Sequence, residues 1–212
     1  SMSSTIGVQN IAHTNGTNAM TVASDGVVAF NNNPTGITIP ASDFKLLLSD
    51  TISSSVAQYD ISSTYMNSTY DNYVLQATLL PTSDNTHALM RVFENGSVVT
   101  GDKYSYEVAA NSSSVYANSN SVHRFQFTVT QVGNAVGEGI SYNIRMTNVN
   151  STTHAFSYGG ESQGFANAGQ PISQTLGGSL LVANRAIVVN GLRLTFESGN
   201  IASGTIKFYG VA

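Results

Sequence analysis

Short runs of β-branched and aromatic residues, separated by turn signals, recur along the 212-residue chain and constrain its fold more than any other feature. Apolar residues at the i, i+3, i+4, i+7 spacing that marks an amphipathic helix are not sustained anywhere. About eight or more such runs at this spacing are typical of a two-sheet sandwich. The sequence therefore predicts an all-β fold: a jelly-roll-like antiparallel β-sandwich preceded by a short N-terminal β-meander.

The run from His123 to Val132 shows the alternation most clearly. Phe125, Phe127 and Val129 fall on one face and polar residues on the other, which predicts a half-buried antiparallel strand. Three polar connections are expected at 117–122, 147–153 and 158–170. Comparable runs predict further strands at Phe44–Leu48, Ser55–Ile61, Tyr73–Leu80, Ala88–Phe93, Tyr104–Val108, Ser141–Asn148, Ala186–Phe196 and Gly204–Tyr209. Ile39–Leu48 is the one segment that could form either a strand or one turn of helix, because Pro40 could open a helical turn.

The N-terminal part is expected to be a separate meander. Asn15-Gly16 and Asp25-Gly26 are hairpin-type turn signals between short apolar runs at Ile6–Ile11, Ala19–Val22 and Val27–Phe30. The polar run at residues 31–36 then has the composition of a linker. We therefore expect a neck over residues 1–35, with Ser1-Met2 interpreted as an expression scar, and a sandwich head over residues 36–212.

Composition excludes several functional classes. Eight Lys and Arg against 12 Asp and Glu give a net charge of −4, so no basic surface is expected to bind nucleic acid. The absence of Cys excludes a disulfide framework and thiolate metal sites. No apolar stretch approaches the roughly 18 residues of a membrane span, so no membrane insertion is expected.

No motif indicates catalysis, a metal or a cofactor. His13, His87, His123 and His154 are widely separated and form no zinc-type pattern. No nucleophile elbow, P-loop or dinucleotide fingerprint is present. Carboxylates could still converge in space as a glycosidase pair, although the spacing favours no pair; the candidates are Asp60, Asp71, Asp84, Glu94, Asp102, Glu107, Glu138 and Glu161. We expect no enzyme activity and no cofactor.

Aromatic residues give the best indication of binding. The chain has 10 Tyr and 9 Phe but no Trp, and tyrosine joins a flat apolar face to a hydroxyl group, which suits sugars and protein partners. Tyr73 and Tyr106 lie inside alternating runs and are expected in the sheets. Tyr116, Tyr158 and Phe165 lie in expected loops and are the candidate ligand-binding residues.

Three stretches resemble modules of phage virion proteins. Val8–Val22 with Asp25-Gly26 is similar to a repeat-like segment before the C-terminal heads of tail fibres. Gly191–Val211 resembles the closing strand pair of those heads. Tyr70–Leu75, followed by Leu80-Pro81 and Ala88–Val92, is similar to their central strands. The resemblance covers about a third of the chain and implies a jelly-roll head on the virion surface. It also implies that the head is commonly trimeric and often contacts a host glycan or protein.

The leading hypothesis is therefore a tail-fibre or appendage domain that takes part in host-receptor recognition by multivalent binding. Its expected partners are two further copies of itself, a host cell-surface glycan or protein, and other virion proteins. The hypothesis of a purely architectural capsid or tail part has almost the same weight. A non-viral carbohydrate-binding module and a depolymerising tail enzyme are the remaining alternatives.

Overall fold

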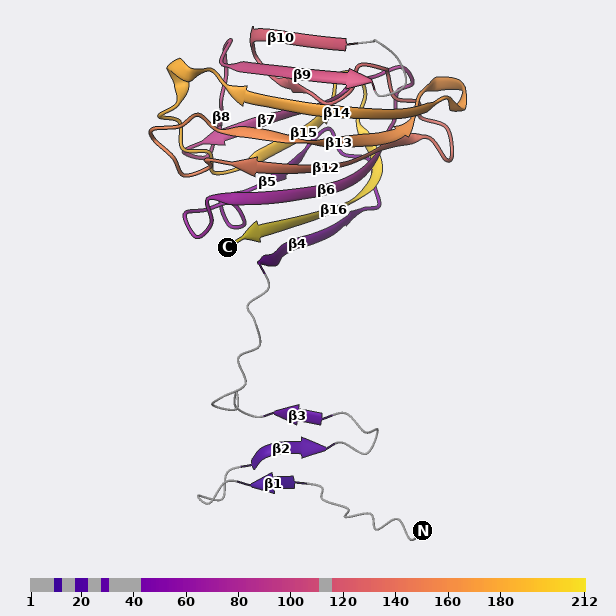
Figure 1. Ribbon diagram of the computed structural model, residues 1–212. Coiled ribbons are helices and arrows are strands. Elements are labelled where there is room, and N and C mark those ends of the chain that lie inside the picture. Colours follow the sequence, from indigo (N-terminus) through magenta and orange to yellow (C-terminus); the bar gives the residue numbers. More distant parts are fainter. Residues whose placement is uncertain (1–9, 13–17, 23–27, 31–42, 111–115) are drawn as a thin grey trace. The chain divides into compact units, whose positions relative to one another are not determined.

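A computed structural model describes residues 10–12, 18–22, 28–30, 43–110 and 116–212 (Figure 1). The chain forms two compact units, Ser1–Ser42 and Asp43–Ala212. The division thus falls after Ser42, whereas the sequence predicted it after residue 35. The predicted linker at residues 31–36 lies outside the described residues.

The first unit contains the predicted three-stranded antiparallel meander. Its strands are β1 (Asn10–Ala12), β2 (Asn18–Val22) and β3 (Val28–Phe30), and β2 lies between the other two. The predicted turns at Asn15-Gly16 and Asp25-Gly26 lie outside the described residues.

The second unit consists of two antiparallel sheets (Figure 1). The large sheet has eight strands in the order β10-β9-β14-β13-β12-β6-β16-β4. The small sheet has the order β11-β7-β15-β5, and β8 pairs with β7. The large-sheet strands are β4 (Phe44–Ile52), β6 (Asn72–Pro81), β9 (Tyr104–Ala110), β10 (Tyr116–Val122), β12 (Gly139–Thr147), β13 (Ser157–Phe165), β14 (Pro171–Leu180) and β16 (Ile201–Val211). The small-sheet strands are β5 (Tyr59–Ile61), β7 (Ala88–Glu94), β8 (Ser97–Val98), β11 (Phe125–Gln126) and β15 (Leu192–Phe196).

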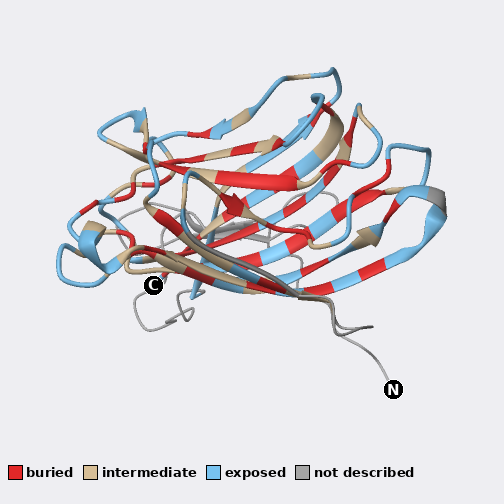
Figure 2. Ribbon diagram, turned by 90° about the horizontal axis from the view of Figure 1, so that it is seen from above, coloured by how far each residue is buried: buried red, intermediate tan, exposed pale blue. Residues whose placement is uncertain are grey.

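The core lies between the two sheets, and alternation along the strands fills it (Figure 2). In β12, Ile140, Tyr142, Ile144 and Met146 are buried, while the residues between them are exposed. Phe127 packs edge-on against Tyr142 from the other side, with ring centroids 5.1 Å apart. Each fully buried large apolar side chain contributes roughly 1.5–3 kcal/mol, so this interior supplies most of the stability.

Two predicted loops are strands instead. The segment 158–170 contains most of β13, and the segment 117–122 belongs to β10. Strand β14 was not among the predicted strands at all. These segments are rich in Gly, Ser, Gln and Thr, and their intrinsic strand signal is weak. β13 forms a strand because it pairs along its whole length with β12 on one side and β14 on the other.

The opposite error occurs at His123–Val132, where only β11, Phe125–Gln126, is a strand. Beyond β11 two large-sheet side chains help to hold the backbone: the Val129 N–H donates to Gln174 Oε1 at 2.7 Å, and Ser162 Oγ donates to the Phe127 carbonyl at 3.1 Å. Backbone bonds add to this, from the Phe127 N–H to Ala88 and between Val132 and Thr86. Thr128, expected on the solvent side, is fully buried. Phe125 and Phe127 are buried as the pattern predicted, but isolated backbone bonds and side-chain bonds stand in place of a continuous strand.

Other predicted strands are confirmed with changed ends. Phe44–Leu48 belongs to the longer strand β4, while Pro40, where the alternative helical turn would open, lies outside the described residues. Ser55–Ile61 and Ala186–Phe196 shorten to β5 and β15. The antiparallel sandwich is therefore confirmed, while jelly-roll connectivity stays a prediction. In the part of the chain that the structure describes, no helix has the length and apolar character needed to cross a bilayer.

Candidate functional site

The sequence-predicted ligand residue Tyr158 is buried, so its assignment to an exposed loop is wrong. It lies in β13 and is only 5% exposed. Its ring packs against Phe125 and Phe127, at centroid distances of 4.8 and 5.4 Å. The ring also lies across Gly178, where a Cβ atom would come within 2.5 Å of Tyr158 Cε1. Burial raises the pKa of the Tyr158 hydroxyl well above its usual value. Tyr158 is a core residue that cannot contact a ligand at the surface.

The structure separates the other two candidates from Tyr158. Phe165 ends β13 and is 42% exposed, so it remains a candidate contact residue. Tyr116 begins β10, where its Cα pairs with that of Ala109, and its side chain lies outside the described part. Phe165 does not line the hollows described next. Their role in binding stays a prediction.

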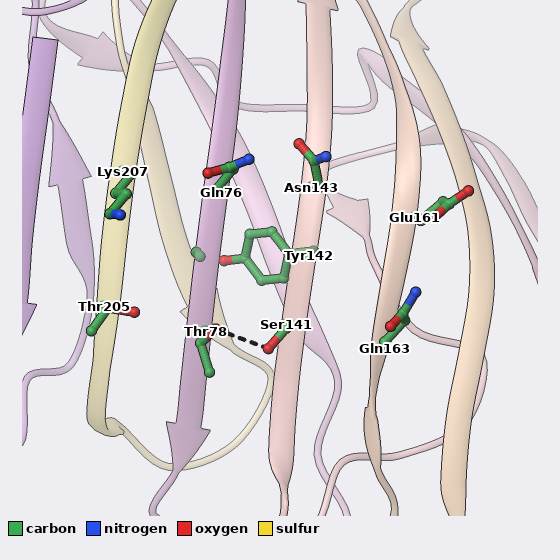
Figure 3. Close-up of a pocket in the computed structure, with 10 residues that line it drawn as sticks. Gln76, Thr78, Ser141, Tyr142, Asn143, Glu161, Gln163, Thr205 and Lys207 are labelled. Carbon is green, nitrogen blue, oxygen red and sulfur yellow. Dashed lines mark hydrogen bonds between the residues drawn. The ribbon is translucent and has the colours of Figure 1, made fainter. Parts of the chain in front are cut away.

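Two rows of polar side chains cross the outer face of the large sheet (Figure 3). Each row contains one residue from each of β16, β6, β12 and β13, and each of these residues is paired in register with its neighbour on the next strand. Strand alternation points these residues outward because their neighbours Ala77, Tyr142 and Ile206 point into the core. The first row is Lys207, Gln76, Asn143 and Glu161, and the second row is Thr205, Thr78, Ser141 and Gln163.

The two rows line a hollow of about 430 Å³. A second hollow of about 630 Å³ adjoins it and shares Gln76, Asn143 and Glu161. Besides these three, its lining includes Arg145, Val74, Gly159, Tyr209 and Phe44. At Gly159 an added Cβ atom would meet only one carbonyl oxygen, at 3.8 Å, so the missing side chain leaves open space beside Arg145. The polar rows therefore border a second region that also offers aromatic rings.

Most of these polar groups have no partner among the residues that the structure describes. Thr78 and Ser141 bond to each other at 2.8 Å. Among the described residues, the side chains of the other six row members and of Arg145 form no hydrogen bond or ion pair. The six row members are Gln76, Asn143, Glu161, Gln163, Thr205 and Lys207. Amides and hydroxyls both donate and accept, carboxylates accept, and Lys and Arg donate. The face thus presents both kinds of hydrogen-bonding group to whatever lies on it.

Several carboxylates singled out from the sequence serve the fold instead. Asp60 forms a two-bonded pair with Arg193, at 2.8 and 2.6 Å. Glu138 accepts the backbone N–H groups of Ala135 and Gly169, at 2.8 and 3.0 Å, and so ties two loops together. No group of three or more His, Cys, Asp or Glu residues that could hold a metal ion occurs among the residues searched, those that the structure describes.

Sequence reasoning missed the polar rows, although part of their signal was visible. Tyr73–Leu80, Ser141–Asn148 and Gly204–Tyr209 were predicted as strands. Their alternate polar residues include six row members: Gln76, Thr78, Ser141, Asn143, Thr205 and Lys207. The missing information was which strands are neighbours. β16 and β6 are adjacent although more than a hundred residues separate them in the chain. No family model, curated protein or solved structure matches the chain.

Proposed function

We propose that this chain is a non-catalytic recognition domain of a phage virion appendage, which binds a host-surface glycan through the outer face of its large sheet. The observation that carries the proposal is the pair of polar rows, whose side chains are mostly unpartnered in the described part of the chain and border a hollow containing aromatic rings. The virion setting comes from the resemblance of the sequence motifs.

Sugar chemistry matches this combination of groups. Every sugar hydroxyl donates and accepts, so it is best bound by amides, carboxylates and hydroxyls that offer both functions. The Asn143 and Gln76 amides and the Glu161 carboxylate can supply them in one row. Sugar rings also carry apolar faces of C–H groups, which pack on aromatic side chains. Phe44, 48% exposed, and the half-buried Tyr209 offer such surfaces in the adjoining hollow.

Multivalency would make weak single-site binding sufficient. An open polar surface that competes with water gives modest affinity, and several copies on one particle raise the effective affinity without new contacts. The N-terminal meander has only three short strands, too few to bury much surface within one chain. We assign it a role in association of three copies.

A glycan array probed with the full chain tests the proposal. We expect binding to at least one glycan class and a loss of about fivefold or more in affinity for Asn143→Ala, because one amide hydrogen bond to a ligand is worth roughly 1 kcal/mol or more. Gln131→Ala is the matched control, since Gln131 is an exposed amide outside both hollows. Binding that Asn143→Ala leaves unchanged would move the site elsewhere. An array with no binding would favour an architectural role or a protein receptor.

Light scattering on the full chain tests the association separately. A trimer is the expected mass. A monomer at micromolar concentration would contradict self-association through the meander, while leaving glycan binding by the sheet face to be judged by the array.

A further inference from the structure

We propose that the ligand is a linear, extended, nearly neutral polysaccharide that lies along the polar rows, across the strands, and is bound through internal units instead of through a chain end. This inference rests on the proposed function and concerns the same face. It names the class of glycan and its direction on the sheet.

The spacing of the first row supports a crosswise ligand. Its four residues occupy neighbouring strands at matched register, and the row continues to Ser49 on β4 and Thr175 on β14. Six positions at an inter-strand distance of about 4.8 Å span roughly 24 Å. An extended pyranose chain advances by nearly the same distance per unit. One sugar unit can therefore lie over each strand and meet an equivalent side chain each time.

The second row supports the same direction. Thr205, Thr78, Ser141 and Gln163 run parallel to the first row and lie two residues further along each strand (Figure 3). Two residues along a strand correspond to about 6.6–6.8 Å, close to the width of a pyranose ring with its substituents. A chain lying between the rows would be contacted along both edges.

Charge narrows the class of polysaccharide. The two rows together carry one cation, Lys207, and one carboxylate, Glu161, on strands separated by three inter-strand gaps, or roughly 14 Å. A chain with an acid group on every unit would place negative charge against Glu161. A hydroxyl-rich chain with little charge meets no such repulsion and can use both ends of the row.

A length series tests the inference. The probes are cello-, xylo-, manno- and N-acetylchito-oligosaccharides of two to six units, together with any linear glycan that the array identifies, measured by calorimetry on the full chain. Affinity should rise at least tenfold from two to five units and then level off. Reduction of the terminal sugar should leave the affinity of the five-unit chain unchanged.

Variants at the two ends of the row supply the second measurement. Lys207→Ala and Glu161→Gln should each weaken the five-unit ligand several-fold, while a two-unit ligand, too short to reach both, should respond to at most one. Gln131→Ala should change neither. Affinity that is independent of length, or a requirement for a free chain end, would overturn crosswise binding yet leave glycan recognition standing. An absence of binding to every glycan on the array would instead overturn the proposed function.

Discussion

The outer faces of the two sheets differ in the ion pairing of their charged side chains. On the small sheet, Arg193 is paired with Asp60 and stacks over the ring of Phe93 at 5.2 Å. Next to the ends of β11 and β15, Arg124 is paired with Glu197. On the large sheet, Lys207, Glu161 and Arg145 have no such partners among the described residues. Two small-sheet arginines are thus held by carboxylates and serve the fold, although Arg91 on β7 has no such partner among the described residues. The charges of the large-sheet rows are available to a ligand.

The strongest test contrasts the two sides of the large sheet itself. Gln174 is fully buried on β14, and its Oε1 accepts the Val129 N–H, whereas Gln163 lies on the outer face of β13. Gln174→Ala should lower the free energy of unfolding by about 1–2 kcal/mol, because it leaves the Val129 N–H unpaired and opens space, while removal of the buried and unpartnered Gln174 Nε2 offsets part of this cost. Gln163→Ala should change it by less than about 0.5 kcal/mol. Urea denaturation of both variants measures the difference; equal costs would contradict it.

The second test breaks the pairing on the small-sheet face. Asp60→Ala leaves Arg193 next to Arg91, its register neighbour on β7, without its carboxylate. We expect a loss of about 1 kcal/mol in stability, since the pair is two-bonded but partly exposed. Glu161→Ala on the large sheet is the matched change and should be nearly neutral in the same denaturation experiment. Glycan affinity should respond in the reverse order, falling only for Glu161→Ala.

The third test concerns the interior between the faces. The Tyr158 hydroxyl is buried and has no hydrogen-bond partner among the described residues. Tyr158→Phe removes this polar group and keeps the ring, so it should stabilise the domain by about 0.5–1 kcal/mol. Thermal unfolding would show a higher midpoint. A lower midpoint would mean that the hydroxyl is paired in solution.

The smallest expected effect depends on pH. His87 is partly buried, and its Nδ1 lies 3.0 Å from Thr128 Oγ1; burial lowers the pKa of His87 below its ordinary value. A lowered pKa means that the unfolded chain binds this proton more readily than the folded one. The contribution of His87 to stability is therefore complete above about pH 6.5 and lost as the pH falls through the folded pKa. Unfolding at pH 7.5 and 5 should show a smaller acid loss for His87→Gln than for the parent chain.

How far the sequence predicts the structure depends on where each strand gets its stability. Strands with strong apolar alternation, such as Tyr73–Leu80 and Ser141–Asn148, were predicted correctly within a few residues. β13 and β14 were missed because Gly160, Gly164 and Ser162 occupy inward positions, and only the neighbouring strands make this segment extended. The candidate site needed the strand order as well. A row built from β16, β6, β12 and β13 cannot be recognised before their adjacency is known.

The position of β16 has a consequence for the synthesis of this domain. β4 is the first strand of the sandwich to leave the ribosome, and among the described strands it pairs with β16, the last. The amide of Ala212 even donates to the carbonyl of Asp43, at 3.0 Å. At translation rates of roughly 5–20 residues per second, β4 must wait on the order of ten seconds for its partner. Its apolar residues Leu47 and Leu48, which pack against the core in the folded domain, stay without that cover until then, so the growing chain is most prone to aggregate before β16 emerges.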